Sequence, residues 1–262
     1  MTDTVSVTPV PAATILIVRD GAAGMEVFMV KRHHQIDFVA GALVFPGGKV
    51  HAGDREADLS DHIDGGGALS DEARALMAAA IREAFEESGI LFAREEGNSG
   101  FVTAEHLAKL DRYRHPLEKG EISLLEMVRA EKLRLAMDCL VPFAHWITPL
   151  NMPKRFDTHF FIAAAPSGHA GAHDGRESVD SIWINPDRAI AERKTWKLVF
   201  PTKLNVMKLA QGKTVAEAIA LARANPPVTV TPWIEDAKDG QLLRIREDAG
   251  YAQTSTLLRN AM

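Results

Sequence analysis

The sequence is poor in several features, and each shortage disfavours a class of protein. It has one cysteine, Cys139, among 262 residues, so no disulfide can form within the chain and a reducing compartment is expected. It carries 30 Lys and Arg against 35 Asp and Glu, whereas nucleic-acid-binding domains usually have a basic surface. No run approaches the roughly 18 apolar residues of a membrane span, and no leader pattern opens the chain. We therefore expect a cytoplasmic protein that binds neither nucleic acid nor membrane.

Along the sequence, strand-like segments alternate with helix-like segments. Short β-rich runs recur along the chain, and amphipathic segments separate them. One helix is expected from Ser70, a good N-cap, to about Ser88, with Gly89 ending it. Two further helices are expected at 104–113 and 123–138, the second opened by a capping box. The expected strands are 13–18, 26–31, 43–45, 140–141, 145–148, 156–165, 179–184 and 228–231.

The helix that ends at Gly89 carries an unusual group of charges. At about 100° per residue, Glu83, Glu86 and Glu87 form one acidic stripe about 100° wide. Like charges at these spacings repel, and a divalent cation would relieve the repulsion because Mg²⁺ prefers oxygen ligands. The alternative is a solvated acidic face. The opposite, buried face would hold Met77, Ile81, Phe85 and Ser88, leaving the stripe to look outward.

The surroundings of this stripe favour the metal-binding interpretation. A glycine turn, Phe45-Pro46-Gly47-Gly48-Lys49, follows a short apolar run upstream. Together the two segments resemble the signature of the Nudix hydrolases, G-x5-E-x7-R-E-U-x-E-E-x-G-U, where U is aliphatic. Asp54 stands where the family usually has Glu, and 27 residues instead of 7 separate it from the second half. The matching positions of that half are Arg82, Glu83, Ala84, Glu86, Glu87, Gly89 and Ile90.

The resemblance implies a fold and an arrangement of the chain. Its fold class is α/β, the Nudix fold, in which a mixed β-sheet is sandwiched between helices. Residues 1–262 would form one Nudix domain, interrupted by a box insertion at about 55–69. A helical hairpin would be inserted at about 103–139, and any homodimer is expected to use it.

The resemblance also implies roles for individual residues. Glu83, Glu86 and Glu87 match the metal-binding and general-base positions, and the Gly48 carbonyl matches a backbone oxygen that often ligates the metal. Arg82 matches an arginine that orients the glutamates. The expected cofactor is Mg²⁺ or Mn²⁺. Which glutamate is the base, and whether Asp54 replaces the first glutamate, stay open.

A fourth carboxylate often comes from a later loop in this family. Glu177 occupies such a loop, and it is either a further metal ligand or an ordinary loop acid.

A second segment bears on the substrate. Thr148-Pro149 and 153–161, which includes R-F-D-T-H-F-F, resemble the Nudix subgroup containing the peroxisomal coenzyme A diphosphatase of animals. Within it, Arg155 would hold a phosphate bidentately or form a structural ion pair. Thr202 would cap a helix whose N-terminus accepts an anion. Lys49 and Arg32 are further candidates for phosphate contact, although Arg32 also fits a solvated strand end.

The predicted function is hydrolysis of a nucleoside diphosphate linked to another group, with coenzyme A or acyl-coenzyme A as the first substrate. ADP-ribose or a dinucleotide such as NADH is the alternative. A binding or regulatory protein that has lost catalysis is a third interpretation. It is disfavoured because Glu83, Glu86 and Glu87 are all present.

Overall fold

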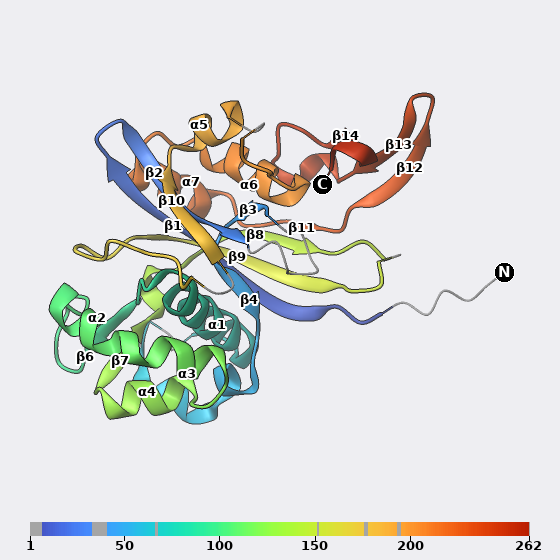
Figure 1. The fold of residues 1–262 in the computed structure, drawn as a ribbon. Helices are drawn as coiled ribbons and strands as arrows, with labels where there is room; N and C mark the ends of the chain where they lie inside the picture. The colour runs from blue at the N-terminus through green and yellow to red at the C-terminus, as the bar shows by residue number, and fades with distance from the viewer. Residues whose placement is uncertain are drawn as a thin grey trace.

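A mixed β-sheet forms the centre of the computed structural model (Figure 1). The structure describes residues 7–32, 41–65, 68–150, 152–175, 178–192 and 195–261, without the side chains of Arg32 and Val179. The strands follow the order β10-β2-β1-β9-β8-β11, while β3 pairs with β2 and β4 with β1. Their bounds are β1 Val10–Gly21, β2 Gly24–Arg32, β3 Leu43–Val44, β4 Gly47–Lys49, β8 Val141–Ile147, β9 Phe156–Ala164, β10 Ser178–Ile184 and β11 Thr229–Val230.

Helices cover both faces of this sheet, because its central strands alternate apolar side chains to both sides. On β1, Ala13 and Ile15 join the core beneath α1, whereas Leu16 and Val18 join the core beneath α6 and α7. The resulting α/β/α layering confirms the predicted fold class (Figure 1). The helices are α1 Asp71–Ser88, α2 Ala104–Leu110, α3 Arg114–Glu118, α4 Leu124–Ala130, α5 Pro186–Ala191, α6 Phe200–Leu209 and α7 Val215–Ala224.

The two segments predicted as insertions pack against each other. β5 (Ile63–Asp64) pairs in parallel with β7 (Leu133–Ala136), and β6 (Ala93–Glu95) pairs with β7 from the other side. The Arg134 Nε donates to Asp64 Oδ1 over 2.7 Å, which joins the two segments across 70 positions. A small three-stranded sheet with α2, α3 and α4 therefore lies on the α1 side of the molecule (Figure 1).

The expected helix at 123–138 is wrong in its second half. α4 begins after Ser123, whose capping box with Glu126 forms as predicted, but the helix ends at Ala130. Leu133 and Leu135 are buried on strand β7 instead. Pairing with two strands from distant parts of the chain outweighs the weak local preference for helix.

The helix expected from Ser70 to Ser88 is confirmed at both ends. The Ser70 hydroxyl accepts from the Ala73 amide, and Gly89 adopts a left-handed conformation with φ of 67°. Its acidic stripe, however, does not look outward, because Glu83, Glu86 and Glu87 are only 7 to 8% exposed. Neighbouring segments cover both sides of the helix.

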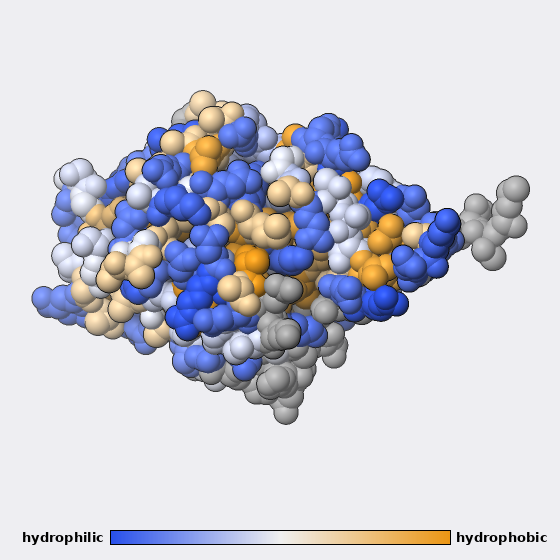
Figure 2. Space-filling view, turned by 90° about the horizontal axis from the view of Figure 1, so that it is seen from above, coloured by the Kyte–Doolittle hydropathy of each residue, from blue (hydrophilic) through white to orange (hydrophobic). Residues whose placement is uncertain are grey.

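The C-terminal part adds a separate three-stranded sheet, β12-β13-β14, in an order that follows the chain. Its strands are β12 Trp233–Ala237, β13 Gly240–Arg244 and β14 Ser255–Leu257. Viewed from the α5 and α6 side, hydrophilic side chains interleave with small apolar groups (Figure 2). Within the described ranges, no helix is both long and apolar enough to cross a bilayer.

Candidate active site

The split motif closes in space through a buried ion pair. Asp54, in the short 3-10 helix Ala52–Arg55, accepts from Arg82 Nε on Oδ1 at 2.9 Å and from Arg82 Nη2 on Oδ2 at 3.0 Å. Both residues are about 3% exposed. The His51 amide also donates to Asp54 Oδ2 over 2.8 Å, which orients the carboxylate. Asp54 therefore lies in the acidic cluster despite the 27 intervening residues, and its shorter side chain still reaches Arg82.

Arg82 connects the cluster to the sheet. Its Nη1 donates to Glu83 Oε1 at 2.8 Å and to Glu86 Oε2 at 3.0 Å. Its Nη2 donates to the Lys49 carbonyl at 2.8 Å, at the end of β4. These bonds add to the bidentate pair with Asp54. Burial lowers the pKa of Arg82, but the surrounding carboxylates more than offset it, so the pKa lies above its ordinary value. The buried guanidinium thus orients two glutamates and ties α1 to β4.

Glu86 is buried, and one of its two carboxylate oxygens lacks a hydrogen-bond partner in the described part of the chain. Burial, the largest cause, raises its pKa to about 8, with Glu83 adding to the shift and Arg82 opposing it. Its Oε1 is buried and accepts no hydrogen bond from the described part of the chain. A buried carboxylate oxygen without a donor is rare, and a bound ion is one of its physical explanations.

Gly47 and Gly48 allow the close approach of the β4 backbone to the glutamates. The Gly47 amide donates to Glu87 Oε2 over 3.2 Å. A Cβ placed on Gly48 would overlap Glu83 Oε1. Any side chain at position 48 would therefore displace the Glu83 carboxylate.

The donor chemistry of these residues would suit a hard divalent cation. Three carboxylates and a backbone carbonyl supply only oxygen donors, the set that Mg²⁺ and Mn²⁺ prefer. Within the described residues Glu86 Oε1 has no hydrogen-bond partner, so this oxygen would be available as a metal ligand. The residues that would hold the ion are Glu83, Glu86, Glu87 and, through its carbonyl, Gly48.

The predicted substrate residues are dispersed around the sheet. Arg155 is buried and donates from Nε to the Thr148 carbonyl at 3.1 Å and from Nη1 to the Val7 carbonyl at 2.7 Å. These bonds tie the chain before β9 to the segment before β1. Lys49 is exposed at the end of β4, next to the cluster. Phosphate binding by Arg155 or Lys49 stays a prediction.

For three other predicted residues, the structure either contradicts the expected helix cap or does not describe the side chain. Thr202 does not cap its helix, because α6 begins at Phe200 with Val199 at the N-cap position. Thr202 is buried inside the first turn of α6, a helix that covers the sheet face opposite α1 (Figure 1). Arg32 ends β2 and pairs through its backbone with Ser178, while its side chain is not described. Glu177 lies outside the described residues. Roles for all three in binding stay predictions.

The sequence motif did not reveal Arg114, which supports the end of α1. It belongs to α3, and its Nε and Nη2 donate to the Glu86 carbonyl at 3.2 and 2.9 Å. A cation at a helix C-terminus stabilises the exposed carbonyls there. No local pattern around Arg114 indicates this contact, because its partner lies 28 positions earlier.

Comparison with known proteins agrees with this geometry. The family model described as the NUDT19 Nudix domain matches residues 60–206, more than half of the chain. That range contains the second half of the split motif and excludes Gly48 and Asp54.

Curated relatives and a solved structure extend the comparison. Acyl-coenzyme A diphosphatase NUDT19 of Xenopus laevis is 26% identical over 222 residues, which are 70% of this chain and 58% of that protein. The Homo sapiens protein of the same name is 26% identical over 92% of this chain and 76% of its own length. A crystal structure of a Nudix hydrolase from Alicyclobacillus acidocaldarius is 25% identical, covers 84% of this chain and 97% of its own, and superposes with a TM-score of 0.67. The chain therefore spans less than two thirds of the frog protein's length. With its matched motif and its fold, it belongs to the Nudix hydrolase family, in the branch described by the NUDT19 Nudix domain.

Proposed function

We propose that this protein is a Mg²⁺- or Mn²⁺-dependent pyrophosphohydrolase whose reaction centre is the buried cluster around Arg82. The observation that carries the proposal is the buried Glu86 Oε1, which has no hydrogen-bond partner among the described residues and belongs to a set of carboxylates that Arg82 holds together. When bound there, the cation would neutralise phosphate charge and lower the pKa of a water ligand.

Different residues of the cluster would bind the ion, accept a proton and position the glutamates. Glu83, Glu86 and Glu87 would ligate the ion, and one of them would accept the proton of the attacking water. Arg82 would orient Glu83 and Glu86 without touching substrate, since it is buried and its donors serve Asp54, Glu83, Glu86 and the Lys49 carbonyl. Water would attack one phosphorus of the diphosphate, the bridging P–O bond would break, and two monophosphates would leave.

The proposed substrate is coenzyme A or an acyl-coenzyme A. The support is the relatives' names, acyl-coenzyme A diphosphatase, together with the R-F-D-T-H-F-F segment on β9. ADP-ribose and NADH contain the same diphosphate group and are the second candidates. A cytoplasmic location and a homodimer remain proposals that rest on sequence.

A substrate panel tests this proposal. Purified protein with Mg²⁺ or Mn²⁺ would be incubated with coenzyme A, acetyl-coenzyme A, ADP-ribose, NADH and a nucleotide sugar, and products would be separated by chromatography. We expect metal-dependent cleavage that is fastest with a coenzyme A compound. Inactivity across the panel with both metals would refute the enzyme assignment. Faster cleavage of NADH than of the coenzyme A compounds would refute the proposed substrate and favour NADH in its place.

A matched pair of variants tests the site. Glu87→Gln should lower kcat by orders of magnitude, because it removes a proposed ligand of the ion and one of the possible acceptors of the water's proton. Glu105→Gln, at an exposed position of α2, is the control and should retain normal turnover. Normal turnover by folded Glu87→Gln protein would contradict the proposed site.

A further inference from the structure

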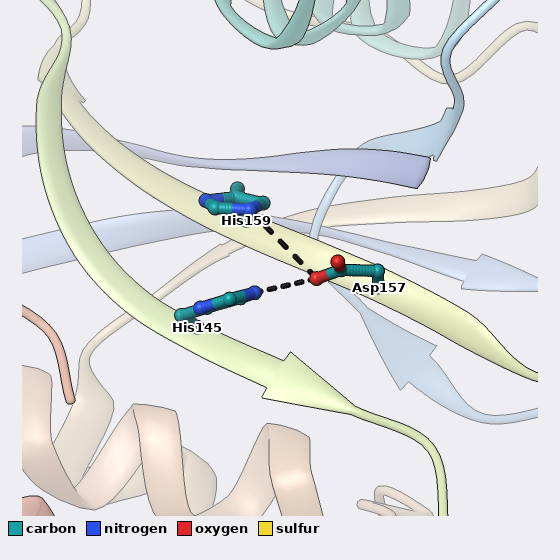
Figure 3. A group of neighbouring side chains, drawn as sticks. All are labelled: His145, Asp157 and His159. Carbon is teal, nitrogen blue, oxygen red and sulfur yellow. Dashed lines mark hydrogen bonds and ion pairs between the residues drawn. The ribbon is translucent and has the colours of Figure 1, made fainter. Parts of the chain in front are cut away.

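A second group of side chains that can ligate a metal lies outside the Arg82 cluster. His145 of β8 and Asp157 and His159 of β9 converge, with their candidate ligand atoms all within 4.8 Å of one another (Figure 3). Asp157 Oδ1 lies 2.5 Å from His145 Nε2 and 3.7 Å from His159 Nε2. The three side chains are between 17 and 36% exposed, so an ion could reach them from solvent.

A β-bulge produces this convergence. β8 and β9 pair in one register at Val141 and Pro142, and the register shifts by one residue before Ala144. The shift places His145 directly opposite His159, on the same face as Asp157. In the earlier register, His145 would oppose Thr158 and point to the other face. Bulges often redirect a side chain beside a functional site.

The group shares a face and a row with the Arg82 cluster. Cross-strand neighbours run from Thr229 through His145, His159 and Ala13 to Gly48. His159 and Gly48 are therefore two strand spacings apart, about 10 Å. None of the three side chains belongs to the Arg82 cluster, so an ion held by them would have its own set of ligands.

The chemistry of the three donors selects a different class of metal. Two imidazole nitrogens and one carboxylate oxygen suit Zn²⁺ and similar transition ions, whereas Mg²⁺ prefers oxygen alone. His145 also has an outer partner, because its Nδ1 lies 2.8 Å from Thr229 Oγ1. Metal-binding histidines usually have such a partner on the second ring nitrogen, which fixes the ring orientation.

We propose that His145, Asp157 and His159 form a binding site for a divalent transition-metal ion, with Zn²⁺ as the best-matched occupant. Three protein ligands leave at least one coordination position open, as in catalytic rather than structural zinc sites. The open position would take water or an anionic group.

Binding requires a small rearrangement of the two rings. They are stacked with centroids 3.9 Å apart and planes 23° apart. A shared ion about 2.1 Å from each nitrogen requires the rings to tilt toward it, with Asp157 Oδ1 moving away from His145 Nε2. Side-chain rotations suffice, because the bulge has already set both rings on one face.

Titration with Zn²⁺ and with Co²⁺ tests the site without relying on activity. The protein would be held in excess Mg²⁺ to occupy oxygen sites, and Zn²⁺ binding would be measured by calorimetry. Co²⁺ would be followed by visible absorption, which is strong only for low-coordinate ions. We expect one Zn²⁺ per chain and a visible Co²⁺ spectrum.

Variants separate this site from others. His145→Gln and His159→Gln should each weaken Zn²⁺ binding at least about tenfold and abolish the Co²⁺ bands. The control is His106→Gln, which removes a histidine paired with Glu95 at 2.8 Å elsewhere in the fold. If a histidine variant unfolds by circular dichroism, Asp157→Asn replaces it. Unchanged Zn²⁺ affinity in folded variants, equal weakening by the control, or no bound Zn²⁺ in the parent protein would overturn the proposal.

Discussion

The protonation of Glu86 should couple the stability of the metal-free protein to pH. Its pKa rises from 4.5 to about 8 in the folded protein, mainly through burial. At 1.36 kcal/mol per pKa unit, this difference corresponds to roughly 5 kcal/mol. The protonated carboxyl is the form that the buried site tolerates, and ionisation without a metal destabilises the fold.

The sign follows from the direction of the shift. Because the folded pKa lies above the unfolded one, the stabilising contribution is complete below about pH 4.5 and is lost as pH rises through about 8. Glu86→Gln stays neutral, so the variant should lack this loss. The difference in free energy of unfolding between the two proteins should change by at most 1.36 kcal/mol per pH unit across this window, up to roughly 5 kcal/mol in total.

The same group should make Mg²⁺ binding depend on pH. The ion requires ionised Glu86, so binding at pH 7 should release close to one proton, and affinity should rise by at most about tenfold per pH unit up to about pH 8. Calorimetry in two buffers of different ionisation enthalpy measures the released protons. Mg²⁺ is used because its preference for oxygen avoids His145 and His159.

Three measurements test the protonation of Glu86 and its part in Mg²⁺ binding. Urea denaturation of metal-free protein from pH 5 to 9 should show the predicted divergence between parent and Glu86→Gln. Proton release should disappear in the variant and persist in Glu105→Gln. A parent protein whose Mg²⁺ affinity is independent of pH, with no proton released, would refute the claim that a protonated Glu86 must ionise to ligate the ion.

Two further substitutions test the packing of the cluster. Gly48→Ala should lower metal-dependent turnover by at least about tenfold, because the new Cβ would overlap Glu83 Oε1 and displace the carboxylate. Steady-state kinetics measures the turnover, and a thermal melt checks that the variant is folded. Normal turnover would contradict the prediction. Asp54→Ala should cost roughly 3–5 kcal/mol in free energy of unfolding, since it leaves buried Arg82 without its bidentate partner. Urea denaturation measures the cost, and a loss below about 1 kcal/mol would show that Glu83 and Glu86 compensate.

The spacing of the motif located Asp54, and the structure showed which residue its carboxylate contacts. The spacing from Gly48 to Asp54 matched the first half of the Nudix signature, yet the following insertion left the role of Asp54 open. The structure brings its carboxylate to Arg82 because Ala52–Arg55 packs against α1. Asp54 and Arg82 are 28 positions apart, so their contact depends on how the inserted segment between them folds. The spacing of residues within the motif does not determine that fold.

The sequence by itself determined what depends on neighbouring residues. The ends of α1 follow from the Ser70 hydroxyl and the left-handed Gly89, and the common side of the three glutamates follows from the helical repeat. The tertiary structure alone decided which groups from distant segments meet. It buried the acidic stripe, made Leu133–Ala136 a strand, and used a bulge to set His145 opposite His159. Such contacts depend on strand pairing and burial between segments far apart in the chain, whose free energy exceeds local propensity.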